Sequence, residues 1–258
     1  CAGLPMIPFF RKLRKQLAEE NKRSKYLRYA LGEIILVVIG ILIALQINNW
    51  NEHQKKLTSA TEHLQLLAEN IEDDLIQLKD LKTKIDSCLL DANRLSQQFQ
   101  LIKPVDVSTP KYIMSALLEY RINPSKNGLE TLNTSGEFSI LHSTMQSDIF
   151  NYYTLLDKIA VREEISNTFI KSRYEPYFFE HYSQVLNKNN SWGIIADYYA
   201  DDAREIEPFD SHKFLQDKQL EGLIFGRTYQ MKQQIDLYTE AIDLANRILS
   251  KIDATLKK

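Results

Sequence analysis

The chain has 258 residues, and its 32 Lys and Arg nearly balance its 34 Asp and Glu, for a formal net charge of −2. Its two cysteines exclude a framework of internal disulfides. The near-zero total hides an asymmetry: residues 11–28 hold eight basic and two acidic residues, a formal +6, and residues 30–258 hold 24 basic and 32 acidic residues, a formal −8. The larger part of the chain therefore offers no basic face for nucleic acid.

Residues 1–29 are predicted to form a basic cytoplasmic tail. A short amphipathic helix is expected within it, with basic residues toward lipid phosphates and an apolar side formed by Phe9, Phe10, Leu13 and Leu17. Such a helix lies flat on an anionic leaflet. The tail is too short for a kinase or response domain, which argues against a conventional transmembrane receptor.

Residues 30–48 are predicted to form a single transmembrane helix. No side chain from Ile34 to Leu45 is polar, and residues 30–47 would span about 27 Å as a helix, close to the hydrocarbon thickness of a bilayer. Aromatic residues flank the stretch where rings meet the two headgroup layers: Tyr26, Tyr29 and Trp50. The sequence therefore predicts one membrane span.

The charges set the predicted orientation of this span. A basic flank is retained in the cytoplasm, so we expect the N-terminus inside and residues 49–258 outside. A cleaved signal peptide is the alternative, because it also places a basic segment before an apolar one. The uncleaved anchor is preferred, because the basic region is long and no small-x-small cleavage site follows Leu45.

One charged residue lies inside the predicted span. Glu33 is disfavoured there by a few kcal/mol unless it reaches the headgroups, takes up a proton or finds a partner. It shares a helical face with Gly40 and Ala44, a small-xxx-small pair that lets another helix approach closely. These three residues are the candidates for helix association in the membrane and for a homo-oligomer. The preferred interpretation of Glu33 itself is that it only reaches Arg28 or the headgroups; helix association and proton coupling are the alternatives.

A seven-residue repeat after the span predicts a long helix. Two apolar rows, at residues 57–99 and 60–102, run through seven heptads, and only Asp74 interrupts them. The interval contains no proline or glycine to end the helix. Such a narrow seam suits a parallel homodimeric coiled coil or packing inside the chain's own bundle. Own-chain packing is favoured because later helices also need a partner, and Cys88 within the seam is then expected to be buried.

The later helices show the same spacing. One row is predicted in a helix that continues toward Phe169: Met145, Ile149, Tyr152, Leu156 and Ile159. Another row is Met231, Ile235, Tyr238, Ile242, Ala245, Leu249, Ile252 and Leu256. A shorter helix is expected from Thr109 to about Tyr120, and residues 122–144 are expected to hold short helices and turns. No alternation of period two appears, so the predicted fold is all-α: a transmembrane helix continuing into a long coiled-coil-like helix, then an antiparallel helical bundle.

An aromatic-rich segment covers residues 174–210. Its candidates for a ligand or partner surface are Tyr177, Phe178, Tyr182, Trp192, Tyr198 and Tyr199. Aromatic clusters can line a sugar or peptide pocket. More often they cap the core of a bundle, and that interpretation is preferred here.

No set of residues predicts catalysis. The five histidines are scattered, without the i, i+4 spacing of a helical zinc site. There is no nucleophile elbow, phosphate-binding glycine loop or paired-cysteine motif. We therefore expect a protein that is not an enzyme, with no catalytic, cofactor-binding or metal-binding residues.

The N-terminal signature carries a resemblance. Residues 32–52 read GEIILVVIGILIALQINNWNE, a basic stretch precedes them, and residues 129–136 read LETLNTSG. Together these segments resemble an uncharacterised family of single-span inner-membrane proteins of Gram-negative bacteria. The resemblance implies an inner-membrane location and a periplasmic helical domain, and it brings no catalytic residues.

Three functional hypotheses follow. The leading one is a non-enzymatic protein that crosses the lipid bilayer once and whose periplasmic bundle binds or positions another envelope protein. The alternative is a ligand-sensing domain, with the aromatic segment as its pocket, that signals through the span to a separate protein. A weaker alternative is an ion-coupled motor subunit that uses Glu33.

Overall fold

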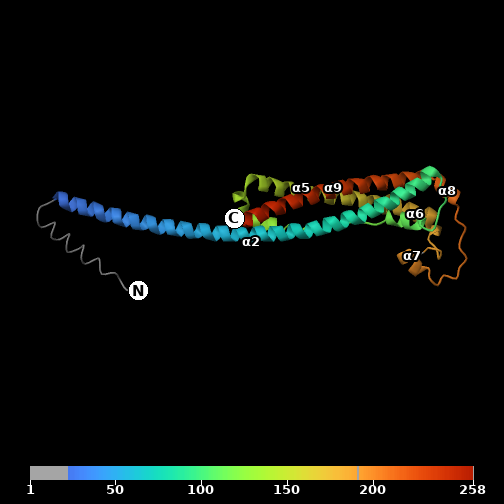
Figure 1. Cartoon of the computed structure of the whole chain (residues 1–258), viewed down its shortest axis with the longest axis horizontal. Helices are drawn as coiled ribbons and strands as arrows, with labels where there is room; N and C mark the ends of the chain where they lie inside the picture. Colours follow the sequence, from blue (N-terminus) through green and yellow to red (C-terminus); the bar gives the residue numbers. More distant parts are fainter. Residues whose placement is uncertain (1–22, 191, 258) are drawn as a thin grey trace. The chain divides into compact units, whose positions relative to one another are not determined.

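The computed structural model describes residues 23–190 and 192–257 of the chain. Helices are the only regular elements among these residues, so the predicted all-α fold is confirmed. The three long helices are α2 (Arg23–Leu101), α5 (Ser143–Phe169) and α9 (Lys218–Leu256) (Figure 1). The short ones are α3 (Thr109–Ser115), α4 (Asn127–Thr134), α6 (Glu175–Tyr182), α7 (Gly193–Tyr198) and α8 (Ser211–Gln216). Two 3-10 turns, Glu137–Ile140 and Ser183–Val185, and a π-helical turn, Ile170–Tyr174, complete them.

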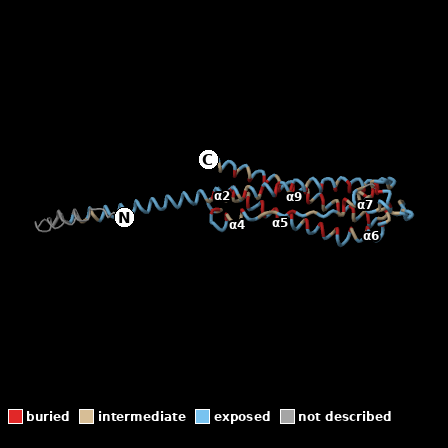
Figure 2. The backbone as a smooth tube through the Cα atoms, turned by 90° about the horizontal axis from the view of Figure 1, so that it is seen from below, coloured by how far each residue is buried: buried red, intermediate tan, exposed pale blue. Residues whose placement is uncertain are grey.

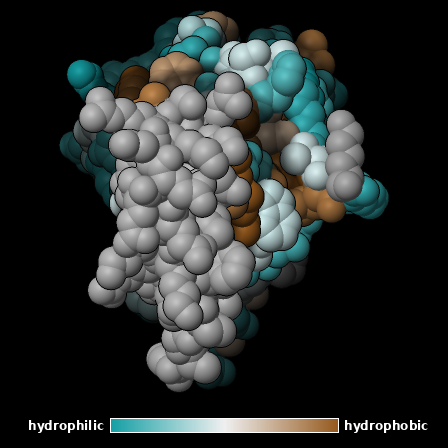
Figure 3. Space-filling model, turned by 90° about the vertical axis from the view of Figure 1, so that its left-hand side faces the viewer, coloured by the Kyte–Doolittle hydropathy of each residue, from teal (hydrophilic) through white to brown (hydrophobic). Residues whose placement is uncertain are grey.

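The chain divides into two compact units, Cys1–Ala60 and Thr61–Lys258. In the first unit the described residues belong to α2, and the predicted tail helix around Phe9 lies outside them. From Ala30 onward α2 is long and apolar enough to cross a membrane, with a mean hydropathy of 2.6 over its most apolar part. None of that part is buried. Hydrophobic residues also reach the surface on the side of the molecule where α2 begins (Figure 3).

In the second unit the heptad seam of α2 lies in the core. Its buried members are Leu64, Leu67, Ile71, Asp74, Leu78, Leu81, Ile85, Cys88, Ala92, Leu95 and Phe99. The apolar ones share a single hydrophobic core with residues of α5 and α9, so this seam packs inside its own chain. Cys88 is buried, as predicted. Ile102, the last residue of the second row, is instead 71% exposed, because α2 ends at Leu101 and the backbone of Ile102 turns to a φ of 49°.

Helices α5 and α9 lie side by side and run antiparallel (Figure 1). Asp148 near the start of α5 pairs with Lys251 near the end of α9 at 2.6 Å. Their buried faces turn toward the core of the bundle (Figure 2). The predicted row of α5 is buried throughout, whereas the row of α9 alternates between buried and half-buried residues. The reason is that the buried face of α9 also includes Gln234, Ala241 and Ile248.

The connection between α2 and α5 contains, between α3 and α4, an extended segment that we call the strap, residues 118–126. The helix predicted from Thr109 to about Tyr120 ends at Ser115 instead, and the strap carries the chain back along α2. Gln77 of α2 binds the backbone of Asn123, while Asp74, one turn earlier in α2, binds Ser125. The strap is therefore antiparallel to α2. Short helices and turns follow it, as the sequence predicted for residues 122–144.

The backbone of Gly128, just after the strap, lies close to the backbone of α2. Its N–H donates to Asn70 Oδ1 at 2.8 Å, and a Cβ added there would lie 2.6 Å from Leu67 Cα. Because backbone atoms cannot step aside as a flexible side chain can, Gly128→Ala is expected to lower the free energy of unfolding by about 2–3 kcal/mol. Thermal unfolding of the full chain in detergent measures this loss.

Gly222→Ala in α9 is the matched control. A Cβ at Gly222 would meet nothing within 4 Å, so this change should leave stability unchanged or raise it by up to about 1 kcal/mol through helix propensity. Equal effects of the two substitutions would mean that the strap does not need the close approach at Gly128.

Candidate functional site

Two tyrosines of α6 bind one carboxylate. Asp217 accepts hydrogen bonds from the hydroxyl groups of Tyr177 at 2.7 Å and Tyr182 at 2.5 Å, and its other oxygen caps the N-terminus of α9. Burial alone would raise the pKa of Asp217, but these hydrogen bonds outweigh it and lower the pKa. Burial and the bond to Asp217 raise the pKa of Tyr177 to about 12. The cluster therefore fixes α6 to the start of α9.

Three of the six aromatic candidates lie on α6 and belong to the end of the bundle core. Phe178 is fully buried, and Tyr182 meets Phe214 edge-on at 5.1 Å between ring centroids. Phe214 also contacts Phe99 at the end of α2, at 5.0 Å. With Tyr177, these side chains fill the space between α2, α6 and α8, and the packing leaves their polar atoms bonded to protein groups.

The other three candidates lie at α7. Trp192 precedes this helix, Tyr198 ends it, and Tyr199 follows it, with the last two rings edge-on at 4.9 Å. We call residues 192–207 the α7 loop. Ile195 on the inner side of α7 is 4% exposed, whereas Ile194 is 72% exposed and Tyr198 is 78% exposed. The inner side thus holds the helix against the protein, and the outer side leaves two large apolar side chains uncovered.

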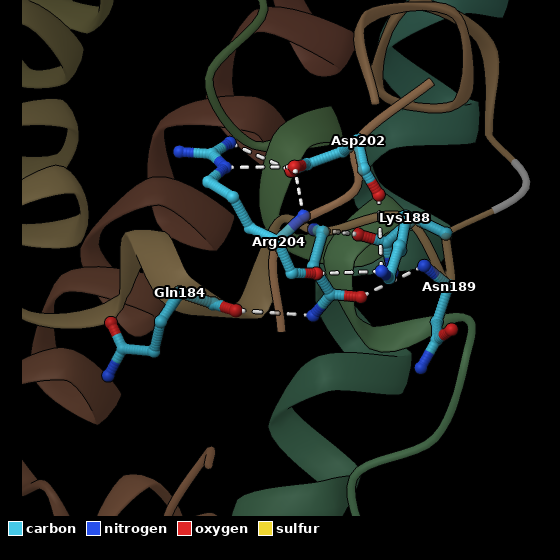
Figure 4. Close-up of polar contacts among 7 residues, drawn as sticks. Gln184, Lys188, Asn189, Asp202 and Arg204 are labelled. Atoms are coloured by element: carbon cyan, nitrogen blue, oxygen red, sulfur yellow. Dashed lines mark hydrogen bonds and ion pairs between the residues drawn. The ribbon is translucent and has the colours of Figure 1, made fainter. Parts of the chain in front are cut away.

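A polar clasp closes the base of the α7 loop (Figure 4). The Nζ of Lys188 donates to the carbonyl oxygens of Asp202 at 3.1 Å and Arg204 at 2.7 Å. The guanidinium of Arg204 binds both carboxylate oxygens of Asp202 at 2.8 Å. These bonds hold the pKa of Asp202 at about 2. The clasp joins the segment after α6 to the segment after α7, so the loop has a fixed base.

A second polar cluster lies in the core and holds the strap by its backbone. Asp74 accepts from the N–H of Ser125 at 3.2 Å and from the hydroxyl of Tyr152 at 3.2 Å. Glu163 accepts from the N–H of Ile122 at 3.1 Å and from the hydroxyl of Tyr238 at 2.5 Å. Both carboxylates are fully buried. Burial raises the pKa of each, against hydrogen bonds that lower it.

Arg227 of α9 holds the end of α3 and the start of the strap. Its guanidinium donates to the carbonyl oxygens of Ala116 at 2.9 Å and Leu118 at 3.1 Å, and to the hydroxyl of Ser166 at 2.6 Å. The residue is 1% exposed, and burial lowers its pKa to about 10. No carboxylate lies within ion-pair distance of it among the described residues. The backbone carbonyl groups at the end of α3 and the start of the strap thus take the place of water and of a counter-ion around the guanidinium, which stays charged at neutral pH.

The predicted membrane face lies on the first unit. Glu33, Gly40 and Ala44 all belong to α2, and a Cβ added at Gly40 would meet nothing within 4 Å. The surface at Gly40 is therefore open to a second helix. Association of two spans through this face stays a prediction.

The described residues place no group of three or more His, Cys, Asp or Glu side chains where they could hold a metal ion. The architecture defines a class of protein: an all-α chain in which an exposed apolar helix precedes a helical bundle. Residues 33–188 match the model of a family described as "Family of unknown function (DUF6090)". Because the match covers more than half of the chain, the protein belongs to this family. No curated protein and no solved structure matches the chain.

The residues that match the family include only part of the bundle. It begins at Glu33 and ends at Lys188, so it includes the apolar part of α2, the strap, α5 and α6. It excludes α7 and α9. The matched residues therefore include most of α2, all of α5 and the strap, and they leave the α7 loop and the third long helix, α9, beyond the match.

Proposed function

We propose that this chain is a non-enzymatic, single-span membrane protein whose helical bundle binds or positions another protein of the bacterial envelope. The apolar part of α2 carries the proposal. Its large hydrophobic side chains from Ile34 to Ile47 are all at least 46% exposed, and leaving each of them in water costs on the order of 1 kcal/mol. A bilayer removes this cost over a helix about as long as its hydrocarbon layer is thick.

The charge asymmetry supports the orientation in this proposal. Residues 11–28 carry a formal +6 and precede the apolar stretch, whereas residues 30–258 carry a formal −8. A basic flank stays in the cytoplasm. The proposed location is the inner membrane, with the N-terminus in the cytoplasm and the bundle in the periplasm.

The packing of the bundle supports a binding role over ligand sensing. A sensor built on the aromatic segment needs a pocket lined by its rings. Phe178 and Tyr182 are instead buried among other aromatic side chains, and Tyr177 and Tyr182 use their hydroxyl groups on Asp217. The exposed aromatic and aliphatic groups lie on the outside of α7, where another protein can reach them.

The span is tested by fractionating cells that express the full chain. Alkaline carbonate should leave the chain in the membrane pellet, and protease added to spheroplasts should digest the bundle. Val38→Arg with Leu42→Arg should remove most of the chain from the pellet, because each arginine near the bilayer centre costs roughly 3 kcal/mol. The matched control, Ile76→Arg with Leu90→Arg, alters exposed apolar residues of the second unit and should stay in the pellet.

The same cells provide the readout for binding. A lysine-reactive crosslinker should join residues 61–258 to a protein other than this chain. Mass spectrometry should identify the same partner in repeated experiments. A shortened soluble product, a bundle that intact spheroplasts protect from protease, or crosslinks only to lipid and to further copies of this chain would contradict the proposed function.

A further inference from the structure

The outer side of α7 has the form of a docking anchor. Ile194 and Tyr198 are one helical turn apart, and each is more than two thirds exposed. Large side chains at i and i+4 of one helix are the usual anchors when a helix enters an apolar pocket of a partner. Because Ile195, roughly 100° round the helix from Ile194, is buried against the protein, α7 cannot turn to hide the pair without losing its own contact with the protein.

The clasp holds the segment that carries Ile194 and Tyr198 in place, so that both side chains stay at the surface. Lys188 and the Asp202–Arg204 pair join the two ends of the segment that carries α7 (Figure 4). A loop that is already ordered loses less conformational entropy on binding than a free one. The geometry therefore suits recognition by a preformed surface.

The charge of the α7 loop selects the kind of partner. From Asp197 to Glu207 there are five carboxylates and one arginine, a formal −4. Asp202 is engaged with Arg204. The structure gives no ion pair within the described residues to the four exposed carboxylates that are left: Asp197, Asp201, Glu205 and Glu207. These charges repel the phosphates of a lipid surface and attract lysine and arginine around an apolar pocket.

Other occupants fit less well. A second copy of residues 30–258 carries a formal −8 and meets the loop with charge of the same sign. The chain's own basic segment, residues 11–28, has the complementary charge but lies across the membrane from the bundle in the proposed topology. The remaining occupant is a different protein.

We propose that the α7 loop is the site at which this protein docks a partner protein, one whose surface combines an apolar pocket for Ile194 and Tyr198 with a rim of lysine and arginine. The inference rests on the proposed binding function and names the surface that performs it. Ile194 and Tyr198 supply the affinity. The acidic side chains of the α7 loop speed association and select the partner.

Site-specific photo-crosslinking in intact cells tests this assignment. A photoreactive amino acid is placed in the full chain at Tyr198, or in a separate variant at Ile194. The matched control carries it at Phe225 of α9, which is also 72% exposed. Tyr198 and Ile194 should yield an adduct with one protein, identified by mass spectrometry, and Phe225 should not.

Two variants then separate the apolar and the charged contributions. Ile194→Ser with Tyr198→Ser removes the anchors. A second variant, which we call the rim variant, neutralises the four exposed carboxylates of the α7 loop: Asp197→Asn, Asp201→Asn, Glu205→Gln and Glu207→Gln. The control variant neutralises exposed carboxylates of α9: Asp236→Asn, Glu240→Gln and Asp243→Asn. With the purified chain in detergent and the purified partner, each α7 variant should raise the Kd at least tenfold, and the control should leave it unchanged. Added salt should weaken binding of the unaltered chain and have little effect on the rim variant.

The outcomes distinguish this inference from the proposed function. Adducts with another protein at Phe225 but not on α7 would overturn the assignment and leave the binding function standing. Adducts with lipid or with a second copy at Tyr198, or a Kd that the α7 variants do not change, would also overturn the assignment. A chain that yields no protein adduct from any of these positions, or with the lysine-reactive reagent, would overturn both.

Discussion

Replacing Arg227 with alanine is expected to lower the free energy of unfolding of the bundle by about 4 kcal/mol. The guanidinium supplies donors to the carbonyl oxygens of Ala116 and Leu118 and to the hydroxyl of Ser166. Without it, buried acceptors at the start of the strap have no donor, and a cavity replaces a large side chain. Thermal or urea unfolding of the full chain in detergent measures the loss.

Two further variants identify the cause of that loss. Arg227→Lys keeps the charge but cannot reach three acceptors in different directions, so it should recover only part of the stability. Arg247→Ala, also on α9, removes an arginine that is largely exposed and lies 3.8 Å from Asp148, and should cost less than about 1 kcal/mol. If Arg227→Ala costs no more than Arg247→Ala, the strap is held by other contacts.

The second large effect is a dependence of stability on pH, and it comes from the two buried carboxylates that hold the strap. Asp74 and Glu163 have folded-state pKa values raised above the ordinary 3.8 and 4.5. Between the ordinary and the raised pKa the folded chain binds protons that the unfolded chain has released. The stabilisation is therefore present at low pH and is lost as pH rises through the raised pKa values, by at most about 1.4 kcal/mol per pH unit for each group.

Other charged groups limit the pH range in which Asp74 and Glu163 determine the stability. Asp73 adds to the raised pKa of Asp74, and Arg121 opposes the raised pKa of Glu163. Asp202 and Asp217 have lowered pKa values, so their stabilisation is present above the ordinary 3.8 and is lost as pH falls below it. We therefore expect the midpoint of thermal unfolding to rise as pH is lowered through the raised pKa values of Asp74 and Glu163 toward their ordinary values, and to fall again below the ordinary pKa of Asp202 and Asp217.

Neutral variants test the assignment of this slope. Asp74→Asn with Glu163→Gln keeps an oxygen acceptor for each strap N–H and removes both charges, so stability should become nearly flat over the pH range in which the unaltered chain shows the slope. Glu164→Gln changes the neighbouring carboxylate, which pairs with Arg121 at the surface, and should keep the slope. A slope that survives the double neutral variant would assign the pH dependence to other groups.

The sequence predicted the long helices because their apolar spacing is set by the core that they share. The seam of α2, the row of α5 and the part of α9 from Met231 onward all follow from side chains at steps of three and four, whereas the first turns of α9, from Lys218, were not predicted. The strap could not be predicted in this way. Its backbone is held by side chains of distant helices, so its conformation depends on contacts that have no local pattern.

One sequence signal could have identified the polar cluster. Asp74 interrupts an apolar row, and continuing the row of α5 at the same steps from Ile159 places Glu163 and Ser166 on the buried face. Similarly, steps back from Met231 lead to Arg227. Polar residues at seam positions need buried partners, but the spacing does not say that the partners are backbone groups of another segment.

The six aromatic candidates illustrate the same limit. Composition placed them in one group, yet the structure puts Phe178 and Tyr182 in the core and leaves Tyr198 in solvent. The difference arises because α6 packs on α8 through Phe214, while α7 is held by Ile195 and the Lys188 clasp. Only the three-dimensional arrangement separates a structural ring from a candidate contact.

The long reach from Arg227 back to Leu118 also bears on how the protein is made. A nascent chain that has emerged only as far as Lys188 contains the strap but none of α9. Its α2 seam then has α5 beside it but lacks α9, and the start of the strap lacks the guanidinium of Arg227. The core of the bundle is completed only when α9 arrives, and chaperones that shield apolar helices have their opportunity during that interval.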